Sequence, residues 1–121
     1  EFENNRILAM ETQIELPAGA LSAFTDGGSD APEQAANFLK SIAHRDRLKL
    51  LCGLLDGEQT VAAIEAQVGV SQSAVSQHLA RLKAEGILAA RRDGRQIYYS
   101  ISDPMVRSLI ELLYLRFCAE D

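Results

Sequence analysis

Apolar residues recur every three or four positions along most of the chain, which is the spacing of amphipathic helices. The first such segment begins at Asp30, where a capping-box spacing and a first-turn proline mark a helix start. A second follows His44, and Asp56-Gly57 ends it. The last opens at Asp103-Pro104, an N-cap followed by a proline at the first helical position. The predicted apolar faces are, in chain order, Ala35, Phe38, Leu39 and Ile42; Leu48, Leu51, Cys52 and Leu55, with Leu50 and Leu54 beside them; and Val106, Leu109, Ile110, Leu113 and Phe117.

Two short amphipathic segments between Thr60 and Glu85 predict a helix-turn-helix. The first ends at Gly69, and the second begins at Ser71, a good N-cap, and stops at Gly86. Its inward face is Ala74, Val75, Leu79 and Leu82, and its outward face is Gln72, Ser73, Ser76, Gln77, Arg81 and Lys83. Because recognition helices carry hydrogen-bonding side chains near the N-terminus and cations further along, we expect the first four to read bases and Arg81 to contact phosphate. An ordinary helix pair with a solvated polar face is the alternative.

Two segments of alternating polarity follow, at residues 88–92 and 95–101, and the Asp93-Gly94 pair between them predicts a two-residue hairpin turn. Alternation places Leu88, Ala90, Ile97, Tyr99 and Ile101 on one buried face. Arg91, Arg92 and Arg95 then cluster at the tip, where we expect them to contact phosphates or a minor groove. A helix-turn-helix followed at once by such a hairpin predicts a winged helix: mostly α, with a β-hairpin wing.

The formal net charge of −5 is unusual for a DNA-binding protein, but the charge is unevenly distributed. Residues 1–33 hold seven acidic residues against one arginine, whereas residues 71–95 hold five basic residues against two acidic ones. The sign at the proposed DNA-binding surface is what phosphates respond to. The sequence contains no apolar run of about 18 residues and no signal-peptide pattern, so we expect a cytoplasmic protein without a membrane partner.

Residues 1–29 lack a sustained period and contain several glycines, so we expect a flexible N-terminal tail. Within it, residues 1–9 are interpreted as a non-native extension before a natural start at Met10. Residues 30–121 are expected to form one winged helix-turn-helix domain for DNA binding and dimerisation. The last helix is too apolar for so small a domain to cover, which favours a homodimer through the first and last helices. A monomer with a large core is the alternative.

Three stretches together, FLKSIAHRDRLKLLCGLL, VGVSQSAVSQHLARLKAEGIL and RRDGRQIYYSI, resemble the ArsR (ArsR/SmtB) family of small dimeric winged-helix repressors. The resemblance covers roughly residues 33–118 and implies a repressor that leaves double-stranded operator DNA when an inducer binds. One metal site of the family matches residues 58–62 here, which contain no thiol. A second matches Asp103, Met105, Arg116 and Ala119, which retain one possible ligand. Two thiols would need two further ligands to hold zinc. His44 and His78 are the only histidines, and His78 lies on the predicted recognition helix, so we expect no metal and no cofactor.

Cys52 and Cys118 are the two cysteines of the chain. Taken alone, two cytosolic cysteines are more often buried apolar residues than redox partners. Their placement, however, resembles the persulfide-responsive branch of the ArsR family, which implies that sulfane sulfur donors act as inducers by cross-linking the two thiols. Sensing of a metal, metalloid or other oxidant is the alternative. The chain contains no CxxC, nucleophile-elbow or phosphate-loop motif, so a thiol oxidoreductase is not favoured. A DNA-free interaction dimer would be expected to lack the basic wing.

Overall fold

The computed structural model describes residues 15–119, and the chain divides between Ser41 and Ile42 into two compact units. The first unit contains helix α2 (Ala20–Thr25) and helix α3 (Ala31–Ile42), the latter ending at the boundary. Helix α3 matches the first predicted helix, and the Ser29 hydroxyl accepts a hydrogen bond from the Ala31 amide just before it. Helix α2 falls in the segment expected to be a flexible tail. The proposed extension at residues 1–9 and the start at Met10 lie outside the described residues.

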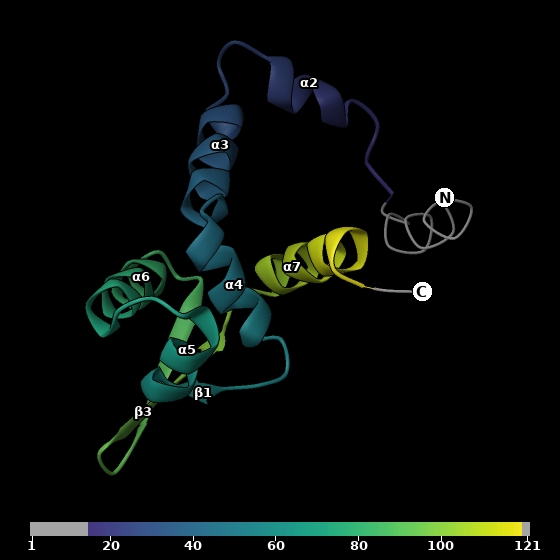
Figure 1. The fold of residues 1–121 in the computed structure, drawn as a ribbon. Coiled ribbons are helices and arrows are strands. Elements are labelled where there is room, and N and C mark those ends of the chain that lie inside the picture. The colour runs from purple at the N-terminus through teal and green to yellow at the C-terminus, as the bar shows by residue number, and fades with distance from the viewer. Residues whose placement is uncertain (1–14, 120–121) are drawn as a thin grey trace. The chain divides into compact units, whose positions relative to one another are not determined.

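The second unit is a winged helix, as predicted (Figure 1). Its helices are α4 (Arg45–Gly53), α5 (Val61–Val68), α6 (Gln72–Ala84) and α7 (Pro104–Phe117). Its strands are β1 (Gln59–Thr60), β2 (Leu88–Asp93) and β3 (Gln96–Ile101). They form one antiparallel sheet in the order β1-β3-β2. The third strand, β1, was not predicted, because two residues are too few to show an alternating pattern. The hairpin of β2 and β3 extends beyond the helices at one end of this unit (Figure 1).

Side-chain caps start the helices of this unit where the sequence predicted them. Ser71 Oγ accepts from the Ala74 amide at α6, and Asp103 Oδ1 accepts from the Met105 amide at α7. His44 Nδ1 accepts a hydrogen bond from the Asp46 amide, so His44 is the N-cap of α4. Each cap satisfies an amide that has no partner within its helix. Helix α4 ends at Gly53, three residues before the predicted Asp56, because the chain continues as a turn through residues 54–56.

The hairpin turn lies one residue later than predicted. The cross-strand pair Asp93 and Gln96 extends both strands, so the two-residue loop is Gly94-Arg95 and not Asp93-Gly94. Gly94 has φ 65° at the first loop position, the conformation a type II′ turn requires there and one that glycine adopts without strain. The predicted apolar face is confirmed, since Leu88 pairs with Ile101 and Ala90 pairs with Tyr99.

Much of the core of the second unit comes from the predicted apolar faces, but the stripe predicted for α4 is displaced, because Leu48, Cys52 and Leu55 are only partly buried. Its buried side chains are Ile42, Leu50, Leu51, Leu54, Ile64, Val68, Val75, Leu79, Leu82, Ile87, Leu88, Val106 and Ile110. Helix α7 has more apolar surface than this core covers: Met105, Tyr114 and Phe117 are 59%, 44% and 74% exposed. None of the helices in residues 15–119 has the length and apolar character needed to span a bilayer.

Candidate DNA interface and cysteine site

The predicted base-reading side chains form one exposed face of α6. Gln72 and Ser76 are one turn apart, as are Ser73 and Gln77, and all four are exposed. Arg81 lies further along the same helix, and its Nε forms an ion pair with Glu85 Oε2 at 3.3 Å. Val75, Leu79 and Leu82 are buried and fix the orientation of the helix. The helix therefore presents short polar groups at its start and cations, one of them paired, near its end.

The three wing arginines do not act as one cluster. Residues paired across an antiparallel ladder share a face, and successive residues alternate. Arg92 pairs with Ile97 and therefore lies on the face of Leu88 and Ala90, whereas Arg91 pairs with Tyr98 on the opposite face. Arg95 lies in the exposed turn. Because Arg91 and Arg92 lie on opposite faces of the hairpin, one DNA groove cannot contact both side chains from the same side.

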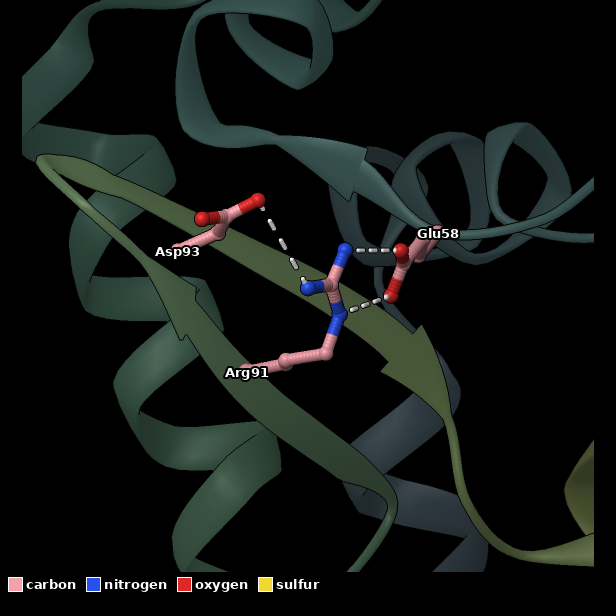
Figure 2. Close-up of polar contacts among 3 residues, drawn as sticks. All are labelled: Glu58, Arg91 and Asp93. Carbon is pink, nitrogen blue, oxygen red and sulfur yellow. Dashed lines mark hydrogen bonds and ion pairs between the residues drawn. The ribbon is translucent and has the colours of Figure 1, made fainter.

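Arg91 is held by protein groups (Figure 2). Its Nε and Nη2 atoms donate to the two carboxylate oxygens of Glu58, in the loop before β1, and Asp93 Oδ2 lies 4.0 Å from Nη1. The guanidinium also lies 4.7 Å from the centre of the Tyr98 ring. The hydrogen bond to Glu58 raises the pKa of Arg91 and lowers the pKa of Glu58. The two carboxylates therefore offset the positive charge of Arg91, so its attraction for a phosphate is weak while both stay in place.

By contrast, Arg92 and Arg95 are exposed, and neither has an ion-pair partner within residues 15–119. Among the wing arginines of the described residues, Arg92 and Arg95 are therefore the ones whose charge no carboxylate offsets. The earlier expectation that Arg91 contacts DNA stays a prediction, but it requires Arg91 to leave Glu58. Sequence reasoning missed Glu58 because its partner lies 33 residues away, and only the pairing of β1 with β3 brings the two side chains together.

Cys52 and Cys118 open onto the same cavity, which has a volume of about 230 Å³. Cys52 is half-buried on α4, and Cys118 is exposed at the C-cap of α7; both are free thiols. The other lining residues are Leu48, Ile110, Leu113, Tyr114 and Phe117, so the cavity wall is almost entirely apolar. The two thiols, distant in the sequence, are thus neighbours in the fold. A hydrogen bond from Arg107 Nη1 to the Leu55 carbonyl, at 3.0 Å, ties the start of α7 to the end of α4.

The two thiols differ in their surroundings. Burial raises the pKa of Cys52, and the negative charge that Cys118 carries as a thiolate raises it further. Cys52 is therefore held as a thiol at neutral pH. Since the thiolate is the nucleophile, the exposed Cys118 is the better placed of the two to react first.

A side-chain group that the sequence did not predict lies where α4 begins. The rings of His44 and His78 are 4.8 Å apart, and Asp46 lies beside them. The only sequence signal was the position of His44 just before a helix, which gives no indication of a partner on α6. This group and the cysteine cavity both lie on α4, at its N-terminal and C-terminal ends.

Comparison with known proteins identifies the family. Residues 44–90 match the family described as "Bacterial regulatory protein, arsR family". The biofilm growth-associated repressor of Xylella fastidiosa is 39% identical over 88 residues, which is 73% of this chain and 77% of that protein. The solved structure of the transcriptional repressor BigR from Xylella fastidiosa has a TM-score of 0.69 and 37% identity, over 75% of this chain and 93% of that chain. Reduced HlyU from Vibrio cholerae N16961 has a TM-score of 0.71 and 37% identity, over 74% and 95%.

The names of these relatives describe transcriptional regulators: the Xylella fastidiosa proteins are repressors, and HlyU from Vibrio cholerae is named a transcriptional activator. The relatives share 37–39% identity with this chain over more than two thirds of their own length, which is more than a shared fold alone produces. The chain therefore belongs to the ArsR family of winged-helix transcriptional regulators.

Proposed function

We propose that this protein is a homodimeric repressor that binds operator DNA as a dithiol and releases it when sulfane sulfur donors cross-link Cys52 and Cys118. One observation carries the proposal: the two cysteines of the chain, on α4 and at the end of α7, line one cavity. The cavity of about 230 Å³ has an almost entirely apolar wall, which suits the apolar part of a small organic sulfur donor.

The chemistry begins at Cys118. Its thiolate attacks the terminal sulfur of an organic persulfide, RSSH, which forms the Cys118 persulfide and releases the thiolate RS⁻. Cys52 then gives its proton to the released RS⁻, and its thiolate attacks the Cys118 sulfur, which forms a Cys52–Cys118 disulfide and expels HS⁻. If Cys118 has first gained two sulfur atoms, attack at the middle sulfur expels HS⁻ and leaves a trisulfide. The longer bridge spans a gap between the cysteines that a direct S–S bond would not.

The half-buried position of Cys52 suits the second step. Its raised pKa keeps it protonated and protects it from direct reaction with solvent oxidants. A persulfide on Cys118 lies inside the shared cavity and is the nearby electrophile that Cys52 can reach. The order of events, Cys118 first and Cys52 second, follows from the exposure of Cys118 and the raised pKa of Cys52.

A cross-link would act on DNA binding through α4 and α7. Helix α4 packs against α5, and α5 packs against the recognition helix α6, so a change at the end of α4 is passed to the DNA-binding surface. Binding of two recognition helices to one duplex depends on their spacing. A coupling of about 1–3 kcal/mol would change operator affinity roughly 5–150-fold, which is enough for a switch.

DNA binding itself is assigned to α6 and the wing. Gln72, Ser73, Ser76 and Gln77 are proposed to read base edges, and Arg81, Arg92 and Arg95 to contact phosphates, with Arg91 joining them only if DNA displaces Glu58 from it. ArsR-family regulators bind DNA and typically form dimers. The exposed apolar side chains Met105, Tyr114 and Phe117 of α7 support a dimer in which α7 and α3 contribute the interface.

The experiment uses an operator fragment that the reduced protein selects from random DNA. Wild-type protein should release this fragment after treatment with an organic persulfide, and mass spectrometry should find Cys52 and Cys118 joined within one chain. Cys52→Ser and Cys118→Ser should each bind the fragment and keep it after treatment. As a matched control, a Cys118→Ser/Ala119→Cys protein has the same number of thiols but carries one of them a single position beyond the cavity lining, and it should respond poorly.

Release by either serine variant on persulfide treatment would show that the two-cysteine mechanism is wrong. Parallel treatment with hydrogen peroxide and with an arsenite salt tests the alternatives, an oxidant or a metalloid as inducer. If one of these releases the wild-type protein and the persulfide does not, the inducer assignment falls while the DNA-binding assignment stands.

A further inference from the structure

Three side chains that the proposed function does not use meet where α4 begins. His44 is the N-cap of α4, Asp46 lies in its first turn, and His78 lies on α6. The two imidazole rings are inclined at 56° with their centres 4.8 Å apart. One donor atom from each of the three side chains lies within 4.8 Å of the others. The fold thus gathers two imidazoles and one carboxylate from segments that are distant in the sequence.

The Asp46 carboxylate provides an independent observation at the same place. Its Oδ1 atom is buried and has no hydrogen-bond partner among the described residues. The ion pair with Arg45 Nε is long, at 3.7 Å, and comes from a side chain that is 85% exposed. A buried carboxylate oxygen without a hydrogen bond is costly, and a cation coordinated to it would remove that cost.

We propose that His44, Asp46 and His78 bind one divalent transition-metal ion of the zinc class, with water completing its coordination. Imidazole and carboxylate donors suit zinc, cobalt, nickel and copper, whereas calcium and magnesium prefer oxygen donors alone. Metal–ligand bonds of about 2.0–2.1 Å in tetrahedral geometry bring donor atoms to roughly 3.3 Å from one another. The three side chains therefore have to close by small rotations. The site differs from both places at which the family resemblance suggested metal ligands, residues 58–62 and 103–119.

Two features indicate a weaker site than a four-ligand structural zinc centre. His44 uses the lone pair of Nδ1 to accept the Asp46 amide, and a neutral imidazole has only one such lone pair. A metal ion therefore competes with the helix cap. Arg47 also places a positive charge near His78, which the Asp46 carboxylate offsets. In the other direction, burial, followed by the charges of His44 and Arg47, lowers the pKa of His78, which favours the neutral imidazole that metals bind.

Metal at this place would join the N-terminus of α4 to the recognition helix. A ligand that binds only the folded protein stabilises it by mass action, so the melting temperature should rise with the metal concentration. This consequence requires neither cysteine. Metal binding and the thiol switch can therefore be tested separately, and either can fail without the other.

The test uses the full chain with Cys52→Ser and Cys118→Ser, so that no thiol competes for metal. Calorimetric titration with Zn²⁺ alone should give one ion per chain, and Zn²⁺ should raise the melting temperature. Cobalt(II) in place of zinc should give the visible absorption of nitrogen and oxygen coordination. His44→Ser, which keeps a capping hydroxyl, and His78→Gln should each weaken Zn²⁺ binding about tenfold or more, since even the loss of an outer-shell partner costs that much.

Asp46→Asn should weaken binding as well, while Glu111→Gln, which removes an exposed carboxylate from α7, should not. Circular dichroism of each variant shows whether it is folded, and if His78→Gln is not, His44→Ser and Asp46→Asn decide the outcome. The absence of Zn²⁺ binding by the thiol-free protein would overturn the proposal. Equal binding by the thiol-free protein and its His44→Ser variant would overturn it too, because the ion would then lie elsewhere.

Discussion

Replacing Arg92 by alanine should weaken binding to every DNA duplex, whereas replacing Arg91 by alanine should change it little. The two residues are adjacent in the sequence and identical in chemistry, so composition cannot separate them. The structure does separate them, because Arg91 is bound by Glu58 and flanked by Asp93, while Arg92 lies on the opposite face of the wing.

The size of the difference follows from counterion release. Each phosphate neutralised by a cation contributes about 0.9 to the slope of log affinity against log salt, so a dimer with two wings loses about 1.8 when Arg92 is removed. Between 50 and 200 mM salt, wild-type affinity should therefore fall about twelvefold more than that of Arg92→Ala. The corresponding difference for Arg91→Ala should be close to zero, because its guanidinium is already neutralised.

The assay is fluorescence anisotropy of a labelled random-sequence duplex at several salt concentrations, since phosphate contacts do not depend on the sequence. Glu58→Gln provides the control. It frees the guanidinium of Arg91, so it should steepen the salt dependence of otherwise wild-type protein and have no such effect in an Arg91→Ala background. If Arg91→Ala flattens the slope as much as Arg92→Ala does, Arg91 leaves Glu58 in the DNA complex, and the division of roles between the two arginines is wrong.

Three further predictions concern base reading, dimerisation and the thiols. Gln77→Ala should cost about 1–3 kcal/mol on a selected operator and much less on random DNA, and equal losses on both would contradict a base contact. Leu109→Glu should place a charge in the proposed apolar interface and shift sedimentation from dimer to monomer, whereas a wild-type monomer at micromolar concentration would refute the dimer. In the Cys118→Ser protein, the rate of alkylation of Cys52 should still rise as the pH passes 9.0, because burial, the larger cause, keeps its pKa raised. A plateau below that pH would contradict this, and in wild-type protein the Cys118 thiolate should slow Cys52 further.

The helices and the wing could be predicted from local patterns because their signals are short-range. The Ser71 and Asp103 caps act within a few residues of themselves, and the apolar periodicity of α6 marks its buried side. Even the error at the hairpin is small, since Asp93-Gly94-Arg95 contains one glycine that fits either of two adjacent turn registers, and the cross-strand pairing of Asp93 with Gln96 selects one.

The sequence by itself thus determined the helices from α3 onward, the hairpin of the wing, the helix-turn-helix motif and the identity of the two cysteines, but neither α2 nor β1. Tertiary structure alone decided that Arg91 meets Glu58 and that His44 meets His78, and it places Cys52 and Cys118 on one cavity, a pairing that only the family resemblance implied. The physical reason is the range of the forces that specify each feature. Helix caps and turns are set by bonds within a few residues, whereas these three pairs depend on how separate elements pack, and no local pattern encodes that packing.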